Sequence, residues 1–115
     1  MSYSISKELF EAVMELKVAK IVVSNHMGDE NRIHYSAMGR EFSGSVLINA
    51  FFFKCKEWLD IKYSDDVVIY KNEVLFIYNL YAEAGIFCIE SFEKDSIQQS
   101  LFDACQWILD NKDKQ

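Results

Sequence analysis

Two histidines are the side chains of this sequence best suited to chemistry. His26 and His34 stand on either side of the segment 27–31, which contains Asp29 and Glu30. Imidazole and carboxylate groups are common ligands of zinc. If this segment is a hairpin turn, the two histidines approach each other across paired strands. Their separation matches no tight ligand motif, so a metal-dependent enzyme centred on them remains an alternative and we expect no metal ligand.

No other segment matches a catalytic or cofactor motif. The segment 39–44 is neither a P-loop nor a dinucleotide-binding fingerprint, and no serine lies in a G-x-S-x-G elbow. Asp65 and Asp66 precede a predicted strand, which is typical of a polar turn rather than of a catalytic carboxylate pair. The sequence therefore favours binding over catalysis, and we expect no cofactor.

The cysteines indicate a reducing compartment. The sequence contains an odd number of cysteines, namely Cys55, Cys88 and Cys105. They form no C-x-x-C pair, and no signal peptide precedes them. Each has apolar neighbours, where cysteine behaves as a small hydrophobic residue. We expect reduced, buried thiols and a cytoplasmic protein.

The charge distribution narrows the choice of partners. The formal charge is −6, of which residues 51–115 carry −5 and residues 1–50 only −1. An acidic surface repels phosphate backbones, so we expect no nucleic-acid partner. The apolar runs are too short to span a membrane. The charge suits a basic protein partner, or serves solubility alone.

The length of the chain and the lack of a linker within it indicate one domain over residues 1–115. No proline or low-complexity linker divides the chain. Apolar periodicity, capping residues and turn residues predict the following elements. These are helices over about 7–18, 47–61 and 95–111, strands over 19–25, 32–38, 66–71, 74–80 and 86–92, and a loop or short edge strand over 39–45.

The order of these elements predicts an α+β fold. The turns between strands are short, which requires antiparallel pairing. We expect a small antiparallel sheet, made of a hairpin plus a three-stranded meander, packed with about three helices. The meander strands are apolar on both faces. Either the helices cover both faces, or one aromatic-rich face is left exposed for association.

The middle helix has more aromatic residues than one core-facing stripe can hold. Its narrow apolar line consists of Ile48, Phe52, Cys55 and Leu59, with Phe51 and Trp58 beside it. Phe53 lies at about 140° from Ile48 and falls between Glu57 and Asp60 on the polar side. Phe53 must therefore meet another part of the chain or a partner.

The last helix has the same excess, because Phe102 and Trp107 lie on opposite sides of its apolar line. An arc this wide exceeds the usual stripe of a surface helix and needs cover on two sides. With Tyr78 of the central meander strand, these aromatics are candidate anchors for a protein partner or for self-association. The predicted binding residues are Phe53, Trp58, Phe102, Trp107 and Tyr78.

Three segments of the sequence resemble segments of other proteins. They are Phe53-Lys54-Cys55-Lys56-Glu57-Trp58, the stretch 104–112 (ACQWILDNK) and the stretch 6–14 (SKELFEAVM). They resemble short bacterial proteins of unknown function from phage or other mobile elements, in which a KCKEW helix precedes a small meander and an ACQWILDNK-like helix ends the chain. The resemblance implies one α+β unit and transfers no functional residue. Accessory proteins of this make-up include inhibitors and immunity proteins, which gives by analogy a non-enzymatic, protein-binding hypothesis; a structural subunit of a homo-oligomer is a further alternative.

Overall fold

The fold consists of three helices and six strands within the residues that this computed structural model describes, which are 3–24, 31–37, 43–62, 67–79 and 86–111. In chain order these are α1 (Lys7–Met14), β1 (Val18–Ser24), β2 (Arg32–Ala37), β3 (Ser43–Leu47), α2 (Ile48–Lys62), β4 (Val67–Tyr70), β5 (Glu73–Asn79), β6 (Ile86–Glu93) and α4 (Ile97–Asn111). All strand pairs are antiparallel. The predicted α+β class is confirmed.

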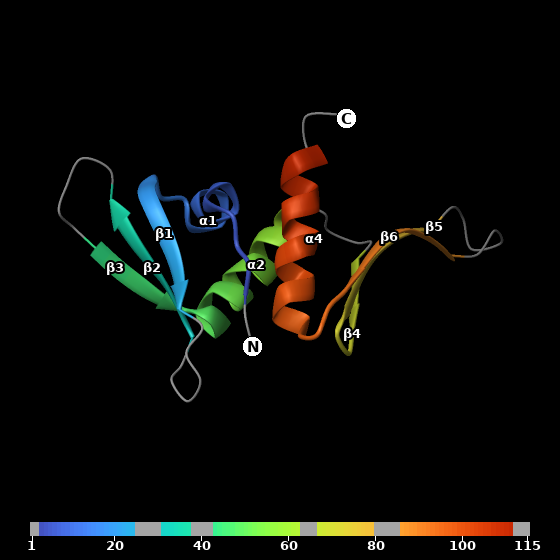
Figure 1. The fold of residues 1–115 in the computed structure, drawn as a ribbon. Coiled ribbons are helices and arrows are strands. Elements are labelled where there is room, and N and C mark those ends of the chain that lie inside the picture. The colour runs from blue at the N-terminus through green and yellow to red at the C-terminus, as the bar shows by residue number, and fades with distance from the viewer. Residues whose placement is uncertain (1–2, 25–30, 38–42, 63–66, 80–85, 112–115) are drawn as a thin grey trace.

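The strands form two separate sheets, ordered β1-β2-β3 and β4-β5-β6. The expected hairpin gains β3 as a third strand and becomes a sheet of its own, while the expected meander forms the other. Figure 1 shows the helices as a central layer with one sheet on each side. Each sheet is therefore covered by helices on one face, which for the meander is the second of the two arrangements that the sequence left open.

This layering produces an elongated, thin molecule. Its extents are 57 × 33 × 18 Å and its radius of gyration is 15.7 Å. A compact domain of about 100 residues has a radius of gyration near 13 Å. The helix layer is thin, so the sides of the helices that face neither sheet and the outer faces of the sheets are left without cover in the described part of the chain.

The sheet β1-β2-β3 has one buried and one solvent-facing side. Ile33 in β2 pairs with Val23 in β1 and Val46 in β3, and its side chain is fully buried against the helices. The alternate residue His34 pairs with Val22, which is 50% exposed. Because alternate residues of a strand point to opposite faces, the His34 face is the outer one.

A glycine helps to form β3, an edge strand in a region for which the sequence left open a loop or a short edge strand. Gly44 pairs with Tyr35, whose ring lies directly over it: a Cβ atom at position 44 would come within 2.7 Å of the ring carbon Cζ. The strand needs this glycine for close approach of the ring, although glycine alone reads as a loop signal.

The sheet β4-β5-β6 packs its inner face on α4. Val74 pairs with Ile69 and Phe92, and Phe76 pairs with Val67. Val74 and Phe76 are fully buried. The pairing is regular along β4 but shifts by one residue between β5 and β6 after Phe76.

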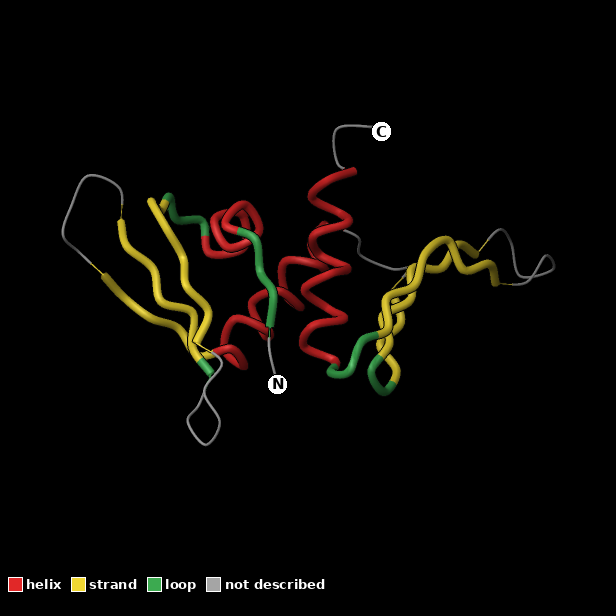
Figure 2. Tube along the Cα trace, in the orientation of Figure 1, coloured by secondary structure: helices red, strands yellow, loops and turns green. Residues whose placement is uncertain are grey.

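Beyond this irregularity, β5 and β6 continue without a third strand among the residues that the structure describes. Ile77–Asn79 pair with 86–88 as a two-stranded ribbon, because β4 begins opposite Phe76. Figure 2 shows this ribbon extending away from the helix layer.

The first helix begins as predicted and ends earlier. Ser6 is its N-cap and accepts a hydrogen bond from the backbone N–H of Leu9 at 3.0 Å. Glu15 then takes the left-handed conformation (φ 55°, ψ 44°), which ends the helix at Met14 rather than near Val18. Val18 instead begins β1, where its backbone N–H donates to Glu11 Oε2 at 2.9 Å.

The last helix begins at Ile97 rather than at residue 95, and Ser96 caps it. The backbone N–H of Gln99 donates to Ser96 Oγ at 3.2 Å. The buried Ser100 hydroxyl then ties α4 to the adjacent sheet, because it donates to the carbonyl of Asn72 at 2.5 Å and accepts the N–H of Lys94 at 2.8 Å.

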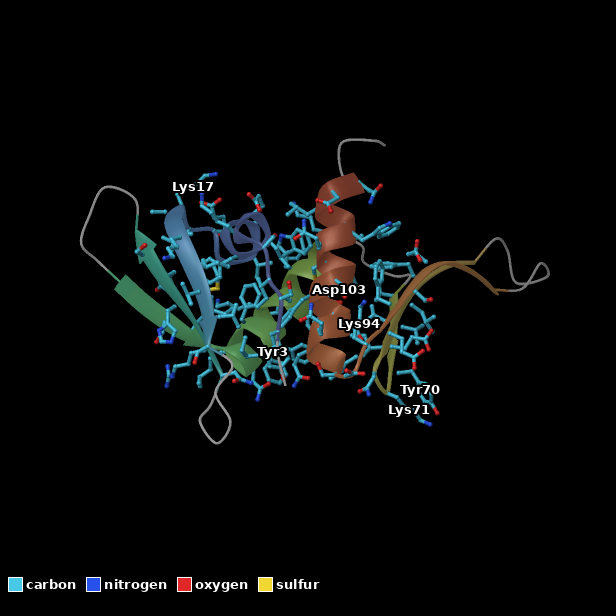
Figure 3. The ribbon with its side chains drawn as sticks, in the orientation of Figure 1. Tyr3, Lys17, Tyr70, Lys71, Lys94 and Asp103 are labelled. Carbon is cyan, nitrogen blue, oxygen red and sulfur yellow. The ribbon has the colours of Figure 1, made fainter. Side chains whose placement is uncertain are left out.

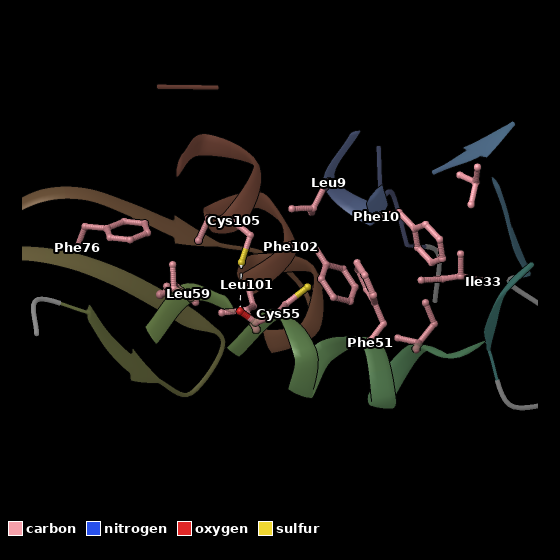
Figure 4. Packing of buried hydrophobic residues seen from close by; sticks show 14 residues of the cluster. Leu9, Phe10, Ile33, Phe51, Cys55, Leu59, Phe76, Leu101, Phe102 and Cys105 are labelled. Atoms are coloured by element: carbon pink, nitrogen blue, oxygen red, sulfur yellow. Dashed lines mark hydrogen bonds between the residues drawn. The ribbon is translucent and has the colours of Figure 1, made fainter. Parts of the chain in front are cut away.

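One cluster of buried side chains runs through all three layers. In Figure 4, Phe10 and Phe51 link the first sheet to α4, where Phe102 follows. Ring centroids are 5.6 Å apart for Phe10 and Phe51, and 5.5 Å apart for Phe51 and Phe102. On the other side of α4, Trp107 packs on Phe76 with centroids 4.9 Å apart.

Glu15→Gly should stabilise the fold by about 0.5–1 kcal/mol, because glycine takes positive φ without the steric cost that a Cβ atom brings. Glu15 is exposed, so little packing is lost. Urea denaturation measures the change. Glu8→Gly, the same substitution at an exposed position inside α1, is the control and should destabilise by a similar amount. If Glu15→Gly also destabilises, the left-handed cap is not the conformation of residue 15.

Candidate protein-binding surface

The middle helix places Phe53 outside the core. Phe53 is 59% exposed, while Phe51 is fully buried and Phe52 is partly buried. The sequence reasoning was correct that the three phenylalanines diverge, but it put Phe52 in the core line that Phe51 occupies. Lys56 Nζ lies 5.9 Å from the centroid of the Phe53 ring, so the exposed ring is flanked by a cation.

Ile61 extends this exposed face towards the end of α2. Its side chain is 79% exposed, the highest value among the large apolar residues described as exposed. Phe53 and Ile61 lie within about 80° of each other around the helix. The second predicted residue of α2, Trp58, is only partly exposed and packs against the core cluster. The exposed apolar side of α2 is therefore formed by Phe53 and Ile61.

Other parts of the same chain cover Phe102 and Trp107. Phe102 is 1% exposed and contacts Phe51, so it has no surface to offer a partner. Trp107 is partly buried and packs on Phe76 and Phe92. The wide apolar arc of α4 needs cover on two sides, as predicted, but α2 and the second sheet supply that cover. This corrects the expectation that Phe102 is a binding residue.

Tyr78 lies on the two-stranded ribbon, where its backbone pairs with Phe87. The surroundings of its side chain lie outside what the structure describes.

Strand β4 carries exposed apolar residues that the sequence reasoning did not select. Val68 and Tyr70, on its outer face, are 40% and 61% exposed, and Ile69, which pairs with the buried Val74 on the inner face, is also 40% exposed. Figure 3 shows Tyr70 and Lys71 at the lower end of this sheet, and Lys71 Nζ lies 5.3 Å from the centroid of the Tyr70 ring. The signal for this surface was present: a short strand with four consecutive apolar residues has two faces, and only one of them can meet the helices.

The histidine site is not assembled in the described residues. His34 is exposed on the outer face of the first sheet, between Val22 and Ser45. His26 and the predicted turn at 27–30 lie outside the described residues. Among the residues described, no three histidine, cysteine or carboxylate side chains come together in a geometry for a metal ion.

Two of the cysteines meet in the core. Cys55 and Cys105 are free and buried, and Cys105 Sγ lies 3.7 Å from the carbonyl oxygen of Cys55 (Figure 4). Burial raises the pKa of the Cys55 thiol, and its hydrogen bond with Cys105 adds to the rise. A protonated buried thiol is a poor nucleophile. Both residues therefore act as small apolar groups.

A cavity of about 190 Å³ opens beside the start of α2. It is lined by Tyr3, Asn31, Leu47, Ile48, Asn49 and Gln98. The side-chain oxygen of Asn31 is buried there without a hydrogen-bond partner. Gln98 Nε2 donates to Asn49 Oδ1 at 3.2 Å. These lining residues include no carboxylate, imidazole or thiol, which are the usual groups of acid–base and nucleophilic catalysis.

Comparisons with known proteins add no relative. No protein-family model, no curated protein and no solved structure gives a significant match to the chain. Within the described residues, no helix has the length and apolar character needed to cross a bilayer.

Phe102→Ala should destabilise the protein by about 3–5 kcal/mol, because it leaves a cavity between α2 and α4. Phe53→Ala, the same truncation on the exposed side of α2, should change stability by less than about 0.5 kcal/mol. Urea denaturation of both variants checks the assignment of one ring to the core and of the other to the surface. Equal destabilisation by the two substitutions would contradict it.

The free energy of unfolding should decrease at alkaline pH because the Cys55 thiol is buried. The unfolded Cys55 thiol titrates near 9.0, while the folded thiol has a raised pKa and stays protonated. Its contribution to stability is therefore complete below about pH 9 and falls above it, by up to about 1.4 kcal/mol per pH unit. Urea denaturation between about pH 8 and about pH 10 should show a steeper loss in the wild-type protein than in Cys55→Ala. Identical slopes would show that the thiol is not protected from ionisation.

Proposed function

We propose that this chain is a non-enzymatic accessory protein that acts by binding another protein. The observation that carries the proposal is the exposed apolar side of α2, where Phe53 is 59% and Ile61 is 79% exposed. Large aromatic and aliphatic side chains that no described element covers are typical of contact surfaces.

The chemistry of the described residues supports binding rather than catalysis. Burial raises the pKa of the Cys55 thiol, and the cavity beside α2 is lined by amide and apolar side chains and the phenol of Tyr3. The alternative of an enzyme centred on the two histidines gains no support, because the described one, His34, lies exposed among Val22 and Ser45.

The class of accessory protein remains a proposal that follows from the sequence. The resemblance to short phage and mobile-element proteins fits an inhibitor or immunity-type protein in the cytoplasm. The net charge of −6 suits a basic partner. A second copy of the chain is the other occupant to test, since exposed apolar faces also form symmetric dimers.

Photocrosslinking tests the proposal. Benzoylphenylalanine at position 53 should give a covalent adduct of discrete mass in cells, because the ring sits in the contact. The same group at position 22 is the matched control, since Val22 is an exposed apolar residue on a different surface. An adduct of twice the chain mass would identify a second copy. The same products from both positions, or no product from position 53, would refute a contact at α2.

A further inference from the structure

The described parts of the two sheets have four edge strands, and β4 differs from the other three. Natural proteins protect free edges with charged residues, bulges or proline, because an unpaired edge is a template for another strand. The pairing of β1 is irregular between Val18 and Lys20, and Lys20 is exposed. The pairing of β6 is also irregular, and its edge carries the exposed Glu90 and Glu93. In β3, glycine and serine make a poor β template.

The free edge of β4 has none of these devices. Its sequence is Val-Val-Ile-Tyr, its register with β5 is regular, and three of its four residues are exposed. These residue types have high β propensity and are uncharged. This is the edge of the described sheets best suited to accept a further strand.

The hairpin geometry identifies the backbone groups that are free. Tyr70 pairs with Glu73 across the two-residue loop Lys71–Asn72. In a two-residue hairpin the pair that closes the loop exchanges both backbone hydrogen bonds, and such pairs alternate along the strands. Tyr70 and Val68 therefore bond to β5, while the N–H and C=O groups of Val67 and Ile69 point away from the sheet and can pair with an incoming strand.

Charge on the outer face of the same sheet selects the occupant. Tyr70, Glu73 and Glu93 form one row across β4, β5 and β6, so two carboxylates are cross-strand neighbours. Like charges in this position repel. Neither carboxylate has an ion pair with a basic side chain in the described residues; the nearby Lys94 pairs with Asp103 at 3.8 Å. A cation brought by a partner would relieve this repulsion.

The row has the dimensions and chemistry to hold a basic side chain. Neighbouring strands lie about 4.8 Å apart, so Glu73 is about 10 Å from the axis of a strand added at β4. A long lysine or arginine side chain on that strand crosses the ring of Tyr70 to reach Glu73. The ring already accepts a cation, since Lys71 Nζ lies 5.3 Å from its centroid. A second copy of this chain would bring the same acidic row and not its complement.

We propose that the free edge of β4 binds an extended, basic segment of a partner protein as an added strand, with its basic side chains lying over Tyr70 towards Glu73 and Glu93. Backbone bonds to Val67 and Ile69 supply affinity and the carboxylate row supplies selectivity, as in other strand-addition interfaces. The inference rests on the proposed protein-binding function and adds a second contact beside the exposed side of α2, with its mode and its charge.

The test uses the full chain and a fluorescent, end-capped octapeptide that alternates arginine and valine. Fluorescence anisotropy at low salt should give a dissociation constant well below about 1 mM. An octapeptide alternating glutamate and valine keeps the β propensity but reverses the charge. One alternating arginine and glycine keeps the charge but lacks the β propensity. Both should bind at least about tenfold more weakly.

Matched variants locate the contact. Ile69→Pro removes the outward N–H, which an edge strand tolerates, and Ile69→Ala truncates the same side chain but keeps the N–H. The proline variant should bind the arginine–valine peptide at least about tenfold more weakly than the alanine variant. The double change Glu73→Gln with Glu93→Gln should also weaken binding, whereas Glu8→Gln with Glu15→Gln, which removes the same charge elsewhere, should not.

Several results would overturn the inference. These are absence of binding up to about 1 mM peptide, equal binding of the acidic peptide, or equal affinities of the proline and alanine variants. A wild-type dimer that becomes a monomer in Ile69→Pro would show that a second copy occupies the edge. Crosslinked adducts at position 53 are a separate measurement. Strand addition at β4 can therefore be refuted while the proposed protein-binding function stands.

Discussion

The fold depends on the burial of α4 on two opposite sides. Phe102 on one side stacks into the row of rings that leads through Phe51 to the first sheet, and Trp107 on the other side packs on Phe76 of the second sheet. Each of these large rings contributes roughly 2–3 kcal/mol through burial. No described strand of one sheet pairs with the other, so helix packing rather than strand pairing unites the two halves.

A single helix layer shared by two sheets has a geometric consequence. Each sheet gains one buried face, and no other element of the described chain covers the remaining faces and edges. This accounts for a chain that is half hydrophobic and still shows large apolar residues at its surface. It also accounts for the thin, 57 Å long shape. The exposed side of α2 and the bare edge of β4 are two results of the same constraint.

The sequence predicted the local features well and the assembly poorly. Helical spacing separated the exposed Phe53 from the buried Phe51, and the predicted start of the first helix at residue 7 matches α1, because both depend on contacts within a few residues. Phe102 was misassigned because spacing shows that a helix needs two-sided cover but does not show what supplies it. The exposed Tyr70 was missed because its exposure depends on which strand ends at a sheet edge, a property of the tertiary arrangement.

Hydroxyl-radical footprinting with mass spectrometry tests this account most directly, because it reports the solvent exposure of each aromatic ring in dilute, unbound protein. If the two sheets share one helix layer, Phe53 and Tyr70 should be oxidised rapidly. The buried rings of Phe51, Phe76 and Phe102 should be strongly protected. Protection of Phe53 and Tyr70 equal to that of Phe102 in a monomer would show that the chain hides its own apolar surface, and the case for a binding protein would fall.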